Sequence, residues 1–234
     1  MHPTDRKAQI QAIVNVFETG KAVGEYGTCV VLPDGAGISY GRSQATDRDD
    51  ALDAIAARYI ADKGPRAADL AGYMKALHAD ATAKLDPQAL PPWCVDLMRL
   101  LRELGADPVM RRAQDAIFDA HYWTPALEHA RDAGVQTPLG LACFYDTAIH
   151  SGPGMIPKMR ARFPERAPAR GGDERSFVAA YVRSRRLWLS AFANPTVAAT
   201  VYRMDALADL ITRGVWTLDP PFDLRVKSRT IRIG

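Results

Sequence analysis

Cysteine is scarce in this sequence, and no two cysteines lie near one another. The three are Cys29, Cys94 and Cys143, so the 234-residue chain has no C-x-x-C pair. This excludes a zinc knuckle and a dithiol redox motif, and at least one thiol stays free unless two chains pair. The five histidines include no H-E-x-x-H pattern, which excludes the zinc hydrolase motif. We therefore expect neither a metal ion nor any other cofactor.

Long apolar runs are missing as well. No stretch approaches the roughly 18 apolar residues that span a membrane, so we expect no membrane span. The first residues, MHPTDRKAQ, contain no apolar core of a signal peptide. The sequence therefore predicts synthesis in the cytoplasm, with leaderless export or cell lysis as the route to any site outside it.

Neither sign of charge is in large excess. A net charge of +3 and a pI near 8.8 fall far short of the basic patches of nucleic-acid-binding proteins, and we expect no nucleic acid partner. Basic residues do alternate with apolar ones in the C-terminal stretch, at Arg225, Lys227, Arg229 and Arg232. They could contact a polyanion, although a solvated strand edge is the simpler interpretation.

Hydropathy patterns predict a mainly α-helical protein with one small sheet near the N-terminus. Residues 4–19 show helical spacing, and TCVVL and GISYG flank PDGA as in a β-hairpin. From about residue 50 the pattern is helical almost throughout, with a Pro/Arg/Gly-rich connection at 155–172 and a single helix expected at 195–213. Residues 219–234 read as one edge strand.

Glu18 lies in the last turn of the first predicted helix. A solvated helix-end glutamate is the simpler interpretation. However, the partial negative charge at a helix C-terminus opposes an anion there and favours a protonated carboxyl group. A protonated carboxyl group is what a general acid requires.

Asp34 lies in the Asp-Gly turn of the predicted hairpin. Asp-Gly by itself is a common turn former. The functional alternative is a general base at the hairpin tip, facing Glu18 across a groove. Inverting glycoside hydrolysis uses such a pair: one carboxylic acid protonates the leaving oxygen, and a carboxylate about 6.5–9.5 Å away activates a water. The residues alone leave both interpretations open.

Asp146 and Arg185 each lie within an otherwise apolar helical face. Because charges in such places are normally paired, we predict that they form a structural ion pair.

Three stretches resemble glycoside hydrolase family 46, the chitosanases. They are VMRRAQDAIFDAHYWTPALEHARDAG, QTPLGLACFYDTAIHSGPG and ARGGDERSFVAAYVRSRR. The resemblance implies a mainly α (α+β), two-lobed fold of the lysozyme superfamily with a cleft between the lobes. It further implies a single catalytic domain over residues 1–234, whose small-sheet lobe is built around residues 20–50 and whose remainder is helical.

The resemblance also assigns roles to residues. Glu18 matches the family's general acid and Asp34 its general base. Ser39 stands where a family threonine orients the attacking water, and Asp50 lies near a family aspartate that contacts substrate amino groups. The other predicted substrate-binding residues are Tyr40 and Arg42, and the predicted ion pair, Asp146 and Arg185, falls on family positions of a buried cluster.

The sequence departs from the family pattern at several positions. Ala36 replaces the arginine of the hairpin motif, which removes one cleft cation. We also expect a further arginine of the buried cluster to be replaced, at Asp209. Ser151 takes the place of a family histidine, one residue after His150.

These departures bear on which substrate is predicted more than on which reaction is predicted. The sequence predicts an endo-acting inverting glycoside hydrolase that cleaves β-1,4 linkages of an amino-sugar polymer, with chitosan as the first substrate. Peptidoglycan, cleaved as by a lysozyme-like muramidase, is the second, and a non-catalytic glycan-binding domain on the same fold is the alternative from another class. By family analogy we expect a monomer that is secreted or directed to the cell wall or periplasm.

Overall fold

The computed structural model describes residues 3–31, 37–42, 44–47, 50–79 and 85–234. Asp34, the predicted base, and Ala36, the position of the replaced arginine, lie outside these ranges. The chain divides into two compact units, which we call unit 1 (Met1–Val23 with Ala120–Gly234) and unit 2 (Gly24–Asp119). The unit that contains the N-terminal sheet therefore extends well past residue 50 and includes four helices.

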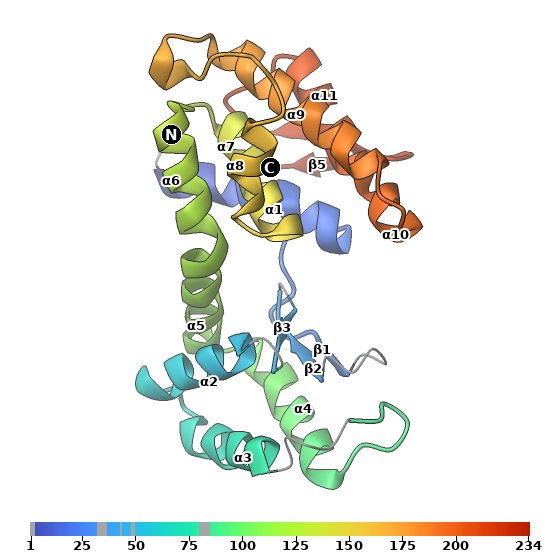
Figure 1. The fold of residues 1–234 in the computed structure, drawn as a ribbon. Coiled ribbons are helices and arrows are strands. Elements are labelled where there is room, and N and C mark those ends of the chain that lie inside the picture. Colours follow the sequence, from blue (N-terminus) through green and yellow to red (C-terminus); the bar gives the residue numbers. More distant parts are fainter. Residues whose placement is uncertain (1–2, 32–36, 43, 48–49, 80–84) are drawn as a thin grey trace. The chain divides into compact units, whose positions relative to one another are not determined.

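Unit 1 is built around α7 (Pro138–Ser151), which is buried along most of its length. Helices α1 (Pro3–Thr19), α6 (Thr124–Ala133), α8 (Met155–Arg160), α9 (Glu174–Ser190) and α11 (Tyr202–Thr212) all contact it (Figure 1). The predicted apolar spacing of α1 is confirmed, since Ile10, Ile13, Val14 and Phe17 are all buried. Apolar helical faces of this kind supply most of the stability of such a unit.

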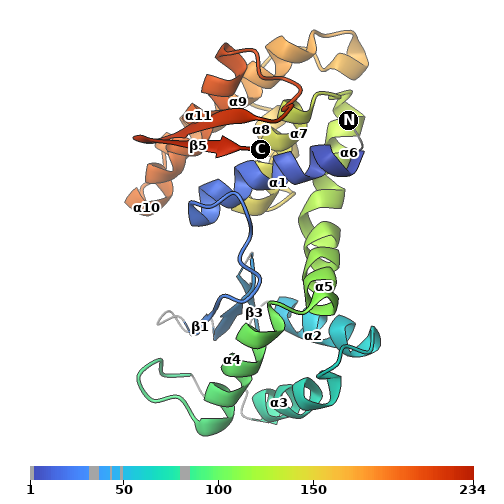
Figure 2. The ribbon, with the colours of Figure 1, turned by 180° about the vertical axis from the view of Figure 1, so that it is seen from behind.

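The C-terminal residues form a two-stranded antiparallel hairpin, β4 (Phe222–Val226) and β5 (Arg229–Ile233), and not one edge strand. Lys227 and Ser228 make the turn, and Lys227 has the left-handed φ of 54° that two-residue hairpin turns demand. In Figure 2, β5 and the C-terminus lie beside α1, which β5 contacts.

Unit 2 contains a three-stranded antiparallel sheet in the order β1 (Cys29–Val31), β2 (Ile38–Tyr40), β3 (Ala45–Thr46). Both strands of the predicted hairpin are confirmed. The strand β3 was not predicted, because a strand of two residues is too short to show an alternating hydropathy pattern. The helices of this unit are α2 (Ala51–Ala61), α3 (Ala67–Ala79), α4 (Pro92–Leu104) and α5 (Pro108–Phe118). A π-helical turn, Asp119–Trp123, follows α5 at the boundary between the units.

Two sequence-based predictions of helical structure were wrong in detail. The connection at 155–172 contains α8 and a 3₁₀ turn, Pro168–Arg170. The single helix expected at 195–213 is three pieces: α10 (Pro195–Ala198), a 3₁₀ turn (Ala199–Val201) and α11. Tertiary packing overrides local propensity in such short segments.

Within the described ranges, no helix is long and apolar enough to cross a membrane. The same residues include no group of three or more histidine, cysteine or acidic side chains that could hold a metal ion. The three cysteines are buried and free.

Candidate active site

Glu18 is held at the C-terminal end of α1, one helical turn beyond the buried Val14. Residues four apart share a helix face, so the carboxylate lies at the edge of the buried face, with its side chain 36% exposed. Gly20 ends the helix in the left-handed conformation, φ 76°, and its amide donates to the Val16 carbonyl at 2.9 Å. The Tyr202 hydroxyl donates to the Phe17 carbonyl at 2.7 Å. The backbone around Glu18 is therefore fixed by both local and long-range hydrogen bonds.

Arg203 is the partner of Glu18. Its Nη2 lies 2.8 Å from Oε1 of Glu18 and 2.7 Å from Oδ1 of Asp146, and its Nε donates to Oδ1 of Asp146 at 2.8 Å. The guanidinium is 2% exposed and Asp146 is fully buried. Burial alone lowers the pKa of Arg203, but Asp146 and Glu18 outweigh burial and raise it above its usual value. Arg203 thus stays charged and ties the helix-end carboxylate to the core of unit 1.

Asp146 and Arg185 form a second contact of this cluster. Arg185 Nε lies 3.7 Å from Oδ2 of Asp146, and both side chains are fully buried. Burial lowers the pKa of Arg185, and the charge of Asp146 opposes that shift. An isolated buried charge would be far more costly than this pair, so Arg185 depends on Asp146, which Arg203 also binds.

His150 completes the cluster as a neutral acceptor. Its Nδ1 lies 3.2 Å from Nη2 of Arg185 and 2.9 Å from the Ser151 hydroxyl. Burial and the charge of Arg203 lower the pKa of His150 to about 4, against an opposing effect of Asp146. Since a guanidinium only donates, the unprotonated Nδ1 accepts from Arg185.

The expectation that Asp209 replaces a cluster arginine was wrong. Asp209 is bound to Arg213 at 2.7 Å and to Arg225 at 3.1 Å, with its side chain partly exposed. Arg203 instead supplies the second arginine of the cluster. Sequence reasoning missed it, although a signal was available: Arg203 precedes Leu207 and Leu210 by four and seven residues, so it is a charge within an apolar face like Asp146 and Arg185.

The remaining predicted residues lie in unit 2, and two of them are buried on β2. Ser39 is 2% exposed, and its hydroxyl has no hydrogen-bond partner among the residues described. Tyr40 is fully buried, and burial raises its pKa. Ser39 thus carries an unused hydroxyl, which a water molecule would satisfy, whereas Tyr40 contributes to packing.

Arg42 and Asp50 differ sharply in exposure. Arg42 is 5% exposed; its Nη1 lies 3.1 Å from Asp115 and donates to the Tyr26 hydroxyl at 3.4 Å. Asp50 is exposed, has the left-handed φ of 60°, and precedes α2 without capping it through its side chain. Asp50 therefore presents a carboxylate that has no hydrogen bond or ion pair with the residues described, while the guanidinium of Arg42 supports unit 2.

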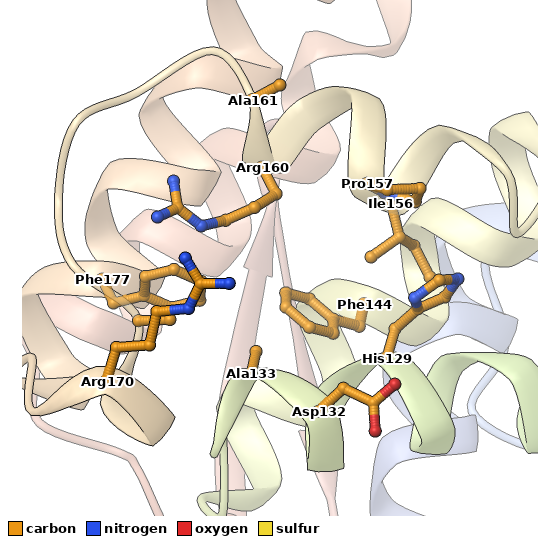
Figure 3. A pocket seen from close by; sticks show the side chains of 11 residues that line it. His129, Asp132, Ala133, Phe144, Ile156, Pro157, Arg160, Ala161, Arg170 and Phe177 are labelled. Carbon is orange, nitrogen blue, oxygen red and sulfur yellow. The ribbon is translucent and has the colours of Figure 1, made fainter.

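A separate pocket of about 480 Å³ lies in unit 1. Figure 3 shows Arg160 and Arg170 converging beside Phe177, with Phe144 at the centre and His129 across from them. Asp132 supplies the one carboxylate among the residues that line it. Because this pocket lacks a carboxyl pair, it does not fit glycoside hydrolysis.

Comparisons with known proteins identify relatives of this chain. The sequence model of glycosyl hydrolase family 46 matches residues 12–222. A chitosanase of Bacillus subtilis (strain 168) is 26% identical over 94% of this chain and 82% of its own length. A chitosanase variant of Bacillus subtilis MY002 with a glutamate replaced by alanine, complexed with 6 GlcN, superimposes with a TM-score of 0.81 at 23% identity over 100% of both chains.

A family-46 chitosanase of Gynuella sunshinyii in complex with chitotetraose has a TM-score of 0.77 and 25% identity, over 100% of this chain and 99% of its own. The predicted fold class, mainly α with small sheets as in the lysozyme-like chitosanases, is confirmed by these likenesses. With a family match over most of its length, the chain belongs to glycosyl hydrolase family 46.

Proposed function

We propose that this glycoside hydrolase is an endo-acting, inverting enzyme that cleaves the β-1,4 linkages of chitosan. The observation that carries the proposal is the placement of Glu18 at the end of α1, with Oε1 2.8 Å from the buried Arg203. Family relatives that bind glucosamine oligomers and chitotetraose support the choice of substrate.

In this mechanism Glu18 is the general acid. It transfers its proton to the glycosidic oxygen as the bond from that oxygen to the anomeric carbon breaks. Arg203 then stabilises the Glu18 carboxylate that remains, because its guanidinium already lies within hydrogen-bond distance of that carboxylate. A charge-assisted contact of this kind stabilises the developing anion without reorganisation.

Asp34 is the proposed general base. It takes a proton from a water molecule that attacks the anomeric carbon from the opposite face, which inverts the configuration. Ser39 is proposed to orient this water, and its buried hydroxyl without a described partner supports the role. The products are a new reducing end and a sugar with a free 4-hydroxyl group.

Substrate recognition is proposed to depend on Asp50, whereas the burial of Tyr40 and Arg42 argues against the substrate contacts predicted for them. The exposed carboxylate of Asp50 suits the ammonium groups of chitosan. Asp50 also has a left-handed backbone that is uncommon outside glycine, and such conformations cluster at functional sites.

Product analysis tests the proposal. The protein is incubated with chitosan and, separately, with purified peptidoglycan, and the products are identified by mass spectrometry and their anomeric configuration by NMR. We expect internal cleavage of chitosan with α-configured new reducing ends. β-configured products would contradict inversion, muropeptide products alone would favour the muramidase alternative, and saturable binding without new reducing ends would favour a glycan-binding domain.

We also propose that the protein acts as a monomer outside the cell that makes it. Light scattering coupled to gel filtration tests the first statement. Immunodetection in culture medium and cell fractions tests the second, with a cytoplasmic marker to reveal lysis.

A further inference from the structure

The pocket of about 480 Å³ around Phe144, Arg160, Arg170 and Phe177, hereafter the Phe144 pocket, contains none of the residues proposed for hydrolysis. Its volume is within the range of about 300–1,000 Å³ that is usual for ligand pockets. Phe144 lies two residues before Asp146 on α7, and residues two apart point to nearly opposite sides of a helix. The Phe144 pocket is therefore on the other side of α7 from Asp146 and its buried partners.

The floor of the Phe144 pocket is apolar. Phe144, Ile156 and Phe177 line it and are all buried. The ring of Phe144 packs on that of Tyr181, with the centroids 4.7 Å apart. The ring of Phe177 packs on that of Phe163, with the centroids 5.3 Å apart. The floor is thus a preformed surface for the apolar part of a ligand.

Arg160 lies at one end of this floor and is held in place by the protein. Its Nη1 donates to the Phe163 carbonyl at 2.9 Å. Its guanidinium carbon lies 4.8 Å from the centroid of the Phe163 ring and 5.2 Å from that of Phe177. Within the described ranges no carboxylate forms an ion pair with Arg160. Because a guanidinium has five N–H donors, Arg160 is oriented and still has donors for a ligand.

Arg170 extends to the same end of the pocket from the 3₁₀ turn that precedes α9 (Figure 3). Its side chain is exposed and has no hydrogen bond or ion pair with any residue described. Asp132 is the carboxylate of the lining, but it lies across the pocket beside His129 and is paired with Arg131 at 3.7 Å. Two positive charges therefore lie over an apolar floor without a described acid to compensate them, and an anion would relieve their mutual repulsion.

The chemistry of the lining favours a carboxylate over other ligands. A planar carboxylate accepts two parallel N–H bonds from a guanidinium and carries a single charge. Asp132 would repel a second negative charge on the ligand. Chitosan is a polycation, which the two arginines repel, so the Phe144 pocket is not a further site for the polymer.

We propose that the Phe144 pocket binds a small monocarboxylic acid with an aromatic or aliphatic body. Arg160 and Arg170 bind the carboxylate, and the body lies on Phe144 and Phe177. The site is separate from the catalytic residues, so the inference goes beyond the proposed function and does not depend on it.

Calorimetry with 4-phenylbutyrate as the probe tests the inference. We expect one binding site per chain. The uncharged 4-phenylbutyramide should bind about 10-fold more weakly or worse, because it lacks the charge-assisted hydrogen bonds. Acetate and inorganic phosphate should also bind at least about 10-fold more weakly, because neither has an apolar body to cover the floor.

Three variants locate the binding site. Arg170→Gln should weaken binding of 4-phenylbutyrate by about three- to tenfold. Arg160→Lys keeps the charge but loses the planar donor pair, so it should also weaken binding; urea unfolding verifies that it is folded. Arg166→Gln is the matched control. It removes the same charge from an exposed arginine of the same connection that does not line the pocket, and binding should stay at the wild-type value.

Thermal unfolding gives a second readout. A ligand that binds only the folded chain raises the Tm as its concentration increases, and Arg170→Gln should reduce this rise while Arg166→Gln leaves it unchanged. Equal affinities for the acid and its amide, or equal losses in Arg170→Gln and Arg166→Gln, would overturn the inference. Tighter binding of phosphate than of 4-phenylbutyrate would overturn it in favour of a general anion site, and no binding at millimolar probe would overturn it outright. No glycan is present in these measurements, so they keep their meaning if chitosan is not cleaved.

Discussion

Arg203 Nη2 lies 2.8 Å from Oε1 of Glu18, so the carboxylate at the end of α1 is bound to a guanidinium that is almost completely buried. The same guanidinium is bound to the fully buried Asp146. The position of the proposed acid therefore depends on a polar cluster formed by α1, α7, α9 and α11.

Removal of either proposed catalytic carboxylate should stop hydrolysis. We expect Glu18→Gln and Asp34→Asn each to lower kcat by about 10²–10⁴-fold, because each change removes one proton transfer. Glu18 is partly exposed and Arg203 keeps Asp146 as a partner, so the stability of Glu18→Gln should change by less than about 1 kcal/mol. Reducing-end assays and urea unfolding measure the two effects, and substantial activity in either variant would refute the assignment.

Arg203→Met should be strongly destabilising as well as inactivating. Asp146 would lose its nearest cationic partner in a buried site, which typically costs about 3–5 kcal/mol. Urea unfolding checks this expectation. Arg186→Met is the matched control, because Arg186 forms an exposed ion pair with Asp205 and its loss should cost less than about 1 kcal/mol. Equal losses in the two variants would argue against a buried structural role for Arg203.

His150 should make unfolding depend on pH between about 6.5 and about 4. Its pKa falls from 6.5 to about 4 on folding, so in this window the unfolded chain binds a proton that the folded chain does not, and stability decreases as the pH falls. Because His150 is partly exposed, the effect is about 1–2 kcal/mol. Urea unfolding across this window should show a smaller slope with pH for His150→Gln. An unchanged slope would mean that His150 does not titrate in this way.

Ser39→Ala should separate stability from activity. The change deletes a buried hydroxyl without a described partner, so the free energy of unfolding should stay the same or rise slightly. If the hydroxyl orients the attacking water, kcat should fall roughly 2- to 10-fold with little change in KM. Ser39→Thr restores a hydroxyl and should restore kcat. A variant with the wild-type kcat would exclude the proposed role.

Arg42 and Asp50 should respond to mutation in opposite ways. Arg42→Met removes a buried contact with Asp115 and should cost roughly 1–3 kcal/mol of stability. Asparagine tolerates the left-handed backbone as aspartate does, so the free energy of unfolding of Asp50→Asn should equal that of the wild type. Its KM for chitosan should rise about two- to fivefold, because the carboxylate is lost. A raised KM without destabilisation in Arg42→Met would instead identify Arg42 as a substrate contact.

Local sequence patterns predicted much of the helical structure. The spacing of Ile10, Ile13, Val14 and Phe17 identified α1, and the strands β1 and β2 were also predicted. Such patterns fail where the segments are short. The strand β3, the helix α8 and the break before α11 follow from packing against distant residues, which no local period records.

The same distinction between local sequence and tertiary structure applies to the candidate site. The sequence by itself determined which residues carry chemistry: a glutamate at a helix end, a charge at Asp146 and one at Arg185 within apolar faces, and four cations in the last residues. Only the tertiary structure decided their partners, because Glu18 and Arg203 are 185 residues apart and meet only when α1 and α11 pack in one unit. The register of the β4–β5 hairpin likewise decided that Arg229 lines a pocket together with Glu18 while Arg232 does not, since a one-residue shift would exchange the two faces.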